Sequence, residues 1–188
     1  KDLSSQKLPI PMLLCVGAIN TFLIEKKLRG YVSINVQSGE ALDTHSFATL
    51  IGVGATTINP YLAFDSLYQR HSKKLFGQFS FDECVQRYIK SVNAGLLKIM
   101  SKMGISVLSS YRGGCNFETV GLSRTVVDDY FPGVTSKISG IGLTGIEKKI
   151  REIHKEAFES TETVLPIGGI YRYRKNGETH QYQGRLIH

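Results

Sequence analysis

A G-x-G-x-x-G pattern at residues 140–145 is the first feature of this chain with the spacing needed for chemistry. In nucleotide-binding folds such glycines follow a strand and open a helix, so that backbone N–H groups can approach a phosphate. Here residues 136–139 are a poor strand sequence, and Thr144 and Glu147 have the spacing of a helix capping box. We therefore interpret the glycines as a turn into a capped helix, with a dinucleotide cradle as the alternative.

A second candidate for anion binding is Arg112, which is followed by Gly113 and Gly114 and preceded by a short apolar segment at residues 105–108. A strand, a glycine turn and a helix N-terminus could together hold an anion or a nucleotide. The lysine and hydroxyl residue of a Walker motif do not follow, however. We favour a strand-to-helix turn at which Tyr111 and Arg112 contact a neighbouring domain, and we keep the anion or nucleotide site as an alternative.

The side chains most often used in catalysis form no recognisable set. The five histidines have no metal-binding spacing, and the adjacent Asp128 and Asp129 would face different sides of a helix. No nucleophile elbow or kinase signature occurs. We therefore predict no catalytic residue, no cofactor-binding residue and no metal ligand in this chain. Three widely separated cysteines favour buried free thiols in a reducing compartment: Cys15, Cys84 and Cys115.

A net charge of +7 leaves a basic nucleic-acid-binding module as another alternative. Tyrosines alternate with basic residues at positions 171–182, where Asn176 and Gly177 predict the turn of a β-hairpin. Such a ribbon could stack on single-stranded nucleic acid, although the same alternation suits ordinary packing of one face. The basic residues at 148–155 are interleaved with glutamates, as on a solvated helix face. We expect a solvated surface, and nucleic acid is not an expected partner.

The first half of the chain alternates between helix and strand patterns. Such alternation predicts βαβ units with parallel strands. Asp43 is placed to cap the second of these helices. The expected helices cover residues 11–27, 43–53 and 61–71, and the expected strands cover residues 31–37 and, as a buried strand, 56–59.

The second half begins with a long helix, opened by a capping box of Ser80 and Glu83 and stopped by Gly104. Its apolar side includes Met100 and Met103, which we expect to be buried. The elements expected after it are a buried strand at 105–108, short helices at 113–120 and 123–131, a helix at 144–158 and the hairpin at 171–182. Ser123 is expected to cap the second of the short helices.

These elements predict an α/β fold in which parallel strands alternate with helices, in a partial barrel-like or layered arrangement with a C-terminal β-hairpin. A chain of 188 residues with 41% hydrophobic and 21% charged residues suits one globular domain with an appendage. Polar residues and Pro166 near positions 160–167 suggest a boundary. We therefore expect an α/β region at 1–160 and a connector with the hairpin at 161–188. No apolar run is long enough to cross a membrane, so no membrane contact is expected.

Several motifs, in order, resemble those of glutamate synthase large chains. The resemblance extends from Pro9 to the hairpin and covers nearly the whole chain. The most specific segments are GVGA at 52–55, NPYLAF at 59–64, KIMSKMGIS at 98–106 and SYRG at 110–113. The chain departs from the family where histidines are usual, at Asn20, Thr21, Phe22 and Thr44, and where Tyr173 replaces a tryptophan.

The resemblance implies the latter part of the central domain and the connector toward the FMN domain. In this family an N-terminal amidotransferase domain cleaves glutamine, and ammonia passes through an internal channel. At the FMN site 2-iminoglutarate is reduced to glutamate, with electrons from an iron–sulfur cluster. The amidotransferase cysteine, the flavin-binding segments and the cluster cysteines have no counterpart in this chain.

The resemblance therefore implies a structural part of an oxidoreductase of glutamate biosynthesis and ammonia assimilation, inactive on its own. The expected partners are the amidotransferase and FMN-binding domains of the same parent chain, meaning the full-length enzyme. FMN and an iron–sulfur cluster are expected in the parent chain and no cofactor in this part of it. The implied location is the cytoplasm or a plastid-like compartment. The electron donor, NADPH, NADH or ferredoxin, stays open.

Overall fold

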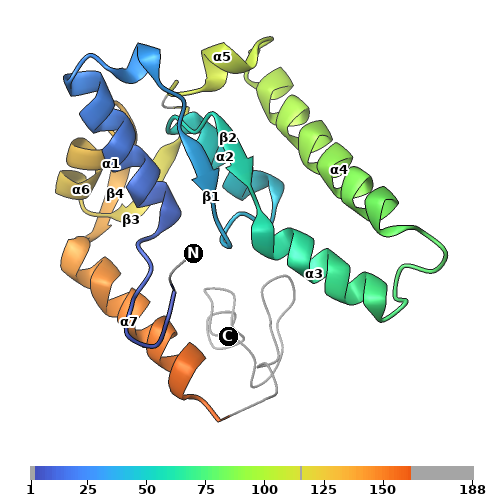
Figure 1. The fold of residues 1–188 in the computed structure, drawn as a ribbon. Coiled ribbons are helices and arrows are strands. Elements are labelled where there is room, and N and C mark those ends of the chain that lie inside the picture. Colours follow the sequence, from blue (N-terminus) through green and yellow to red (C-terminus); the bar gives the residue numbers. More distant parts are fainter. Residues whose placement is uncertain (1–2, 115, 162–188) are drawn as a thin grey trace, which may run out of the picture.

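The computed structural model describes residues 3–114 and 116–161, which form two βαβ units surrounded by helices (Figure 1). The first half contains α1 (Met12–Glu25), the 3₁₀ turn η1 (Arg29–Tyr31), β1 (Asn35–Gln37), α2 (Thr44–Gly52), β2 (Thr57–Asn59) and α3 (Tyr61–Ser72). The second half contains α4 (Phe81–Lys102), α5 (Leu108–Tyr111), β3 (Glu118–Leu122), α6 (Arg124–Tyr130), β4 (Thr135–Ile141) and α7 (Leu143–Glu159).

The first unit, β1–α2–β2, has two parallel strands in the register Val36 to Ile58. The carboxylate of Asp43 caps α2 by accepting a hydrogen bond from the Ser46 backbone N–H at 2.9 Å. This cap and the parallel pairing confirm the predictions for this region. β1 is shorter than the predicted strand at 31–37, because the Arg29 guanidinium donates to the Val32 carbonyl at 2.8 Å and holds the preceding backbone in a turn.

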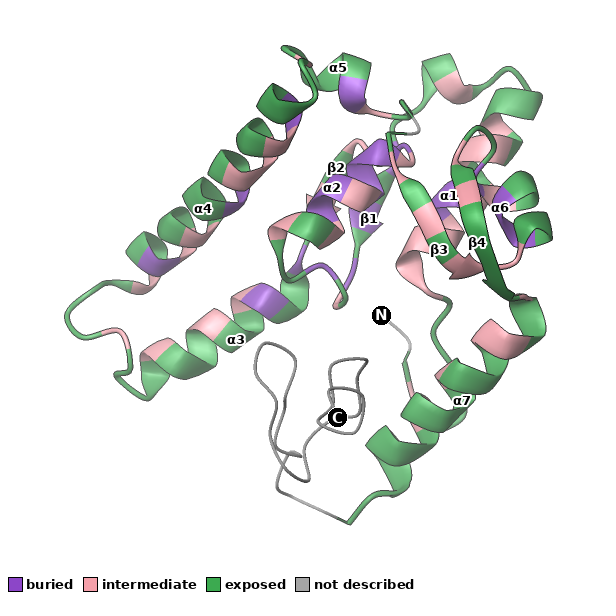
Figure 2. Cartoon of the chain, turned by 180° about the vertical axis from the view of Figure 1, so that it is seen from behind, coloured by how far each residue is buried: buried purple, intermediate pink, exposed green. Residues whose placement is uncertain are grey.

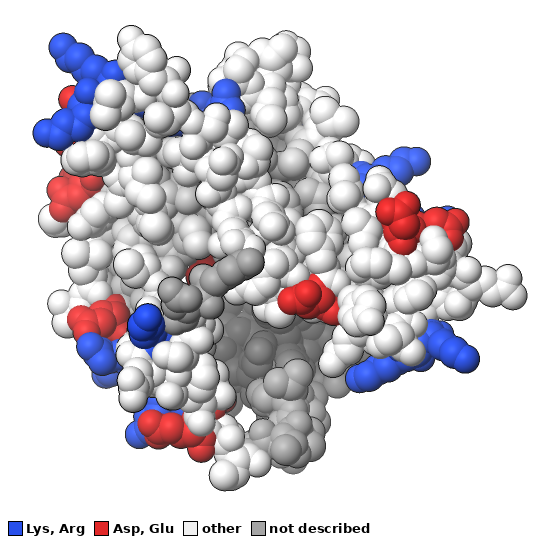
Figure 3. All heavy atoms as spheres, in the orientation of Figure 1, with Lys and Arg blue, Asp and Glu red and all other residues white. Residues whose placement is uncertain are grey.

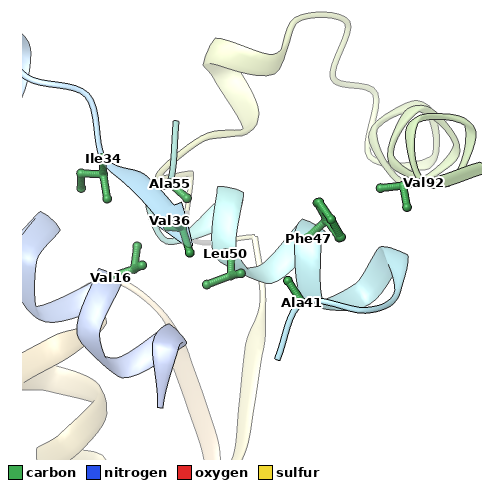
Figure 4. Packing of buried hydrophobic residues seen from close by; sticks show 8 residues of the cluster. All are labelled: Val16, Ile34, Val36, Ala41, Phe47, Leu50, Ala55 and Val92. Atoms are coloured by element: carbon green, nitrogen blue, oxygen red, sulfur yellow. The ribbon is translucent and has the colours of Figure 1, made fainter. Parts of the chain in front are cut away.

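The main hydrophobic core lies in the first unit (Figure 4). Val16 of α1 faces the strand β1, and Phe47 of α2 faces Val92 of α4. Removing these side chains from water is the main favourable contribution to folding. The buried members of this cluster are Val16, Ile34, Val36, Ala41, Phe47, Leu50, Ala55 and Val92. β2 lies at the margin of the core, since its outer residues Thr57 and Asn59 are exposed, and the prediction of a buried strand there was wrong in that respect.

The second unit, β3–α6–β4, also has parallel strands, with bulges that interrupt the register between Thr119 and Leu122. Ser123 caps α6, as predicted, by accepting from the Val126 N–H at 3.3 Å. The predicted helix at 113–120 was wrong, because β3 begins at Glu118. Residues 136–139, which were not expected to form a strand, lie within β4. Pairing between the strands outweighs the weak strand propensity of each segment.

The long helix α4 begins with the predicted capping box, in which Ser80 and Glu83 exchange hydrogen bonds. Met100 is buried as expected, whereas Met103 is 43% exposed and the prediction for it was wrong. Gly104 ends the helix with a φ of +72°. The strand expected at 105–108 is absent from the described residues, since Ile105 packs beside the second buried cluster and α5 begins at Leu108. A short apolar run fits either role, because periodicity does not separate a strand from a packed turn.

The fold class is α/β, as predicted, with parallel strand pairs that do not close into a barrel among the described residues. Figure 2 shows that buried residues gather on α2 and β1, whereas α3 and α7 are largely exposed. In the described part, no helix combines the length and the apolar character needed to cross a membrane. The predicted hairpin at 171–182 and nearly all of the predicted connector at 161–188 lie outside the described residues.

Candidate interdomain surface

Tyr111, the last residue of α5, fixes the turn that follows it to the first unit. Its side chain is 1% exposed, and its hydroxyl donates a hydrogen bond to the Ala48 carbonyl of α2 at 3.1 Å. The ring of Phe117 meets Tyr111 edge-on at 6.1 Å and lies over Gly52, where a Cβ would overlap it. Burial raises the pKa of the Tyr111 hydroxyl, which favours the neutral donor. Tyr111 is thus an internal anchor.

Arg112 is presented on a tight turn beside this anchor. Its backbone N–H donates to the Leu108 carbonyl at 2.9 Å, and its side chain is partly exposed. Gly113 has a φ of +71°, a conformation that favours glycine, and the Gly114 N–H donates to the Tyr111 carbonyl at 3.1 Å. The next described element is β3, so the prediction that a helix opens here was wrong. The alternative of an anion cradle loses the helix N-terminus that it needs.

Close packing explains two of the three glycines at 140–145, namely Gly140 and Gly145. Gly140 lies in β4, where a Cβ would overlap the Gly121 carbonyl of β3. Gly142 precedes the first turn of α7, and a Cβ on Gly145 would come 2.8 Å from Ile141. The predicted capping box of Thr144 was wrong, because α7 begins at Leu143 and has no side-chain cap. A strand is present here, contrary to expectation, but it includes Gly140 and ends at Ile141, so the first glycine does not follow the strand as in a dinucleotide cradle.

The histidines and cysteines that the structure describes are scattered. His45 is exposed on the first turn of α2, and the Nε2 atoms of His71 and His154 lie 3.0 Å from the Phe79 carbonyl and 2.8 Å from the Ser4 carbonyl. Within residues 3–114 and 116–161, no three His, Cys, Asp or Glu residues are gathered as a metal site would require. Cys15 is partly buried on α1, Cys84 is buried on α4, and Cys115 is not among the described residues.

Charged side chains of both signs are mixed over the surface. On α7, Arg151 pairs with Glu147 at 2.7 Å and Lys155 with Glu159 at 3.8 Å, both four residues apart. These are the local ion pairs of a solvated helix face, as predicted for 148–155. Figure 3 shows positive and negative side chains near the outline of one face, with a broad uncharged area between them. This face offers no continuous basic stripe.

Exposed apolar side chains occur on many elements, among them α1 and the strands β3 and β4. On α1, Ile19 and Phe22 point into solvent, and on β3 and β4, Val120 is 66% and Ile138 is 61% exposed. Exposed apolar patches typically mark contacts with other proteins or domains. The exposure of α1 was not predicted, although its segment MLLCVGAINTFLI is mostly apolar, and a helix of that kind is normally buried. The arrangement is suited to packing against other protein surfaces.

A cleft of about 500 Å³ separates the first unit from α4. Apolar side chains from both sides line it, among them Phe47, Ile58, Phe64, Val92 and Leu96. Its polar groups are the side chains of Thr56, Asn59 and Asn93 and the hydroxyl of Tyr88, which donates to the Leu42 carbonyl at 3.1 Å. None of the described residues that line the cleft is charged.

Residues 1–123 match the family model described as the glutamate synthase central domain. The chain is 53% identical over 179 residues to the glutamate synthase [NADPH] large chain of Azospirillum brasilense, and 44% identical over 190 residues to that of Bacillus subtilis. It is 40% identical over 190 residues to the chloroplastic ferredoxin-dependent glutamate synthase of Spinacia oleracea. These alignments cover 95%, 100% and 96% of this chain but 12% of each relative. Since the family model covers well over half of its 188 residues, the chain belongs to the glutamate synthase family.

Proposed function

We propose that this chain is a structural, interdomain part of a glutamate synthase large chain. The observation that carries the proposal is the central-domain match over residues 1–123, in a chain that spans 12% of the length of its relatives. Exposed apolar side chains on α1 and on β3–β4 support it, because they suit burial against further domains. The domains proposed as partners are the amidotransferase and FMN-binding domains of the same parent chain.

In this proposal the parent enzyme converts glutamine and 2-oxoglutarate into glutamate, and ammonia moves between its reactive sites. FMN and an iron–sulfur cluster are held by other parts of the parent chain. The isolated positions of Cys15 on α1 and Cys84 on α4 suit structural thiols in a reducing compartment rather than cluster ligands. This chain contributes the packing that holds the neighbouring domains in place.

Arg112 is the residue proposed to contact a neighbouring domain. Tyr111 positions it, because the hydrogen bond to Ala48 and the contact with Phe117 fix the turn that carries it. A guanidinium is charged at any physiological pH and can donate several hydrogen bonds to a carboxylate or to backbone carbonyls. Arg112 would fix the position of the neighbouring domain relative to this chain without taking part in proton transfer.

The test is the substitution Arg112→Ala in the parent enzyme. Glutamine cleavage should be retained while glutamate formed per glutamine cleaved falls, since the domains lose their register. Arg70→Ala is the matched control, because Arg70 is an exposed arginine at the end of α3, and it should leave the ratio unchanged. An unchanged ratio in Arg112→Ala would contradict the proposed contact.

The net charge of +7 requires a separate test of the nucleic-acid alternative. A protein that neutralises several phosphates binds an oligonucleotide with an affinity that falls steeply with salt. We expect the 188-residue chain to bind a single-stranded oligonucleotide weakly and with little dependence on salt, because its charges are mixed in sign. Tight binding with a steep salt dependence would replace the interdomain proposal.

A further inference from the structure

The first unit is preceded by a helix that lacks a strand of its own. α1 ends ten residues before β1 begins, and Val16 of α1 packs against Ile34 and Val36 in the core. A helix placed over a parallel sheet in this way normally connects two neighbouring strands of that sheet. Between Leu3 and the start of α1, the described residues contain only an isolated bridge from Ser4 to Lys7. α1 and β1 therefore look like the second half of a βαβ unit.

One edge of β1 has no strand paired with it among the described residues. In a parallel pair, alternate residues direct both their N–H and their C=O to the same neighbour. The Thr57 N–H donates to the Ile34 carbonyl, and the Ser38 N–H donates to the Asn59 carbonyl. Together with the pairing of Val36 and Ile58, these hydrogen bonds show that the N–H and C=O of Val36 point toward β2. Asn35 and Gln37 therefore direct their peptide groups away from β2. Both residues are exposed, and β2 is the only described strand that pairs with β1.

α1 is only half covered, which indicates the same missing neighbour. Apolar side chains lie around most of the helix, yet only Val16 and Gly17 are buried, and Phe22 is 54% exposed. Parallel sheets are normally covered on both faces, and their connecting helices lie across two adjacent strands. A strand beside β1 would lie beneath the side of α1 that β1 leaves open.

We propose that the edge of β1 away from β2, at Asn35 and Gln37, binds a parallel strand that precedes this chain in the parent enzyme. The strand would be about five residues long and rich in valine and isoleucine, because it would be buried beneath α1. This inference rests on the proposed function, since it requires a longer polypeptide. The relatives supply that length, because this chain spans 12% of them.

The first test is hydrogen exchange, resolved by residue, in the parent enzyme and in the 188-residue chain. We expect the amides of Asn35 and Gln37 to exchange at least about 100-fold more slowly in the parent enzyme. The amide of Val36, assigned to the β2 side, is the internal control and should change less. Equal exchange at Asn35 and Gln37 in the two proteins would overturn the inference. Slow exchange in the chain alone that depends on its concentration would also overturn it, because a second copy would then be the occupant.

The second test is Gln37→Pro, which removes the N–H at that edge and no hydrogen bond to β2. The thermal midpoint of the 188-residue chain should stay close to that of the wild type, while that of the parent enzyme should fall. Val36→Pro is the matched control, and it should lower both midpoints because it breaks the pairing between β1 and β2. Equal effects of Gln37→Pro in both proteins would overturn the inference.

The two proposals can fail separately. A parent enzyme that contains the unmodified chain and forms no glutamate would contradict the proposed function. The parent enzyme could instead form glutamate normally while the amide hydrogens of Asn35 and Gln37 exchange as quickly as in the isolated chain. That result would contradict only the proposed strand beside β1.

Discussion

The two βαβ units share a topology but differ in how they are covered. β1–α2–β2 receives side chains from α1 and α4 and contains more buried residues than the second unit does, including Val36. β3–α6–β4 leaves Val120 and Ile138 exposed on its strands. The family match ends at residue 123, just after β3, so it includes the first unit and only the opening strand of the second. The same topology can therefore form a core in one place and a contact surface in another.

The difference arises from the helices that surround each unit. α1 packs on the strands of the first unit through Val16, and its Gly17 allows the ring of Phe131, next to α6, to come so close that a Cβ would overlap it. α1 therefore contacts both units, with Val16 buried against the first and Gly17 in close contact with Phe131 beside the second. The first unit should be the more stable of the two when the chain is isolated.

The largest effect is expected where the two units meet, at Tyr111. Tyr111→Ala should lower the free energy of unfolding by about 3–5 kcal/mol, because it leaves a cavity between α2 and Phe117. Tyr111→Phe keeps the ring and loses one hydrogen bond, so it should cost about 1 kcal/mol. Urea unfolding of the 188-residue chain measures both. A loss below about 1 kcal/mol for Tyr111→Ala would show that the units do not depend on this anchor.

Truncation within each unit compares the two cores directly. Val36→Ala, in the first unit, should cost about 2–3 kcal/mol because the side chain is 5% exposed. Ile138→Ala, in the second unit, should change the stability of the isolated chain by less than about 0.5 kcal/mol because it is largely solvated. Thermal unfolding monitored by circular dichroism would compare them. Similar costs would contradict the distinction between a core and a contact surface.

The glycines of the second unit test whether backbone packing, rather than phosphate binding, explains their positions. Gly140→Ala should cost about 1–2 kcal/mol without any added nucleotide, because the new Cβ would overlap the Gly121 carbonyl. Gly142→Ala is the matched control, since a Cβ there would be 3.6 Å from the Ser123 hydroxyl, an ordinary contact. Chemical unfolding of both variants measures the difference. Stabilisation of the wild type by a nucleotide, lost in Gly142→Ala, would instead favour the cradle.

The smallest expected effect is a difference in how two helix caps, Asp43 on α2 and Ser123 on α6, depend on pH. Hydrogen bonds from the Ser46 side chain and backbone lower the pKa of Asp43 below its usual value. The cap on α2 therefore stabilises the protein fully above the unfolded pKa of about 3.9, and its contribution falls as pH drops through the lower folded pKa. Asp43→Ala should cost about 1 kcal/mol at pH 7.

Its control is Ser123→Ala, which removes the cap of α6 in the second unit. The hydroxyl does not titrate in this range, so the cost of this change should be the same at pH 7 and at about pH 3. The cost of Asp43→Ala should be smaller at about pH 3 than at pH 7. Urea midpoints of the three proteins at both pH values provide the comparison, and a cost for Asp43→Ala that does not change with pH would contradict the assignment.

The sequence predicted the elements whose determinants are local. Asp43, Ser80 and Ser123 cap helices where expected, because the hydrogen bonds of a cap are made within a few residues. The strand β4 was missed because its pairing with β3 spans the length of α6 and is invisible in the weak strand sequence at residues 136–139. The prediction of a strand at 105–108 was wrong for the opposite reason, since the apolar residues of this segment suit a strand but pack as a turn.

The same distinction applies to the candidate surface. The sequence placed Arg112 on a turn, but the burial of Tyr111 depends on Ala48, which lies 63 residues earlier in the chain. No local pattern reveals such a contact. The mostly apolar character of α1 could have been recognised from its sequence, because it needs only the composition of one helix.

The contact between His154 and the Ser4 carbonyl, at 2.8 Å, joins residues 150 positions apart. It places the beginning of the described chain beside the last turns of α7. The contact therefore closes a loop that contains nearly all of the secondary structure described. Because the entropic cost of closing a loop grows only slowly with its length, a contact across so long a segment costs little more to form than one across a much shorter loop.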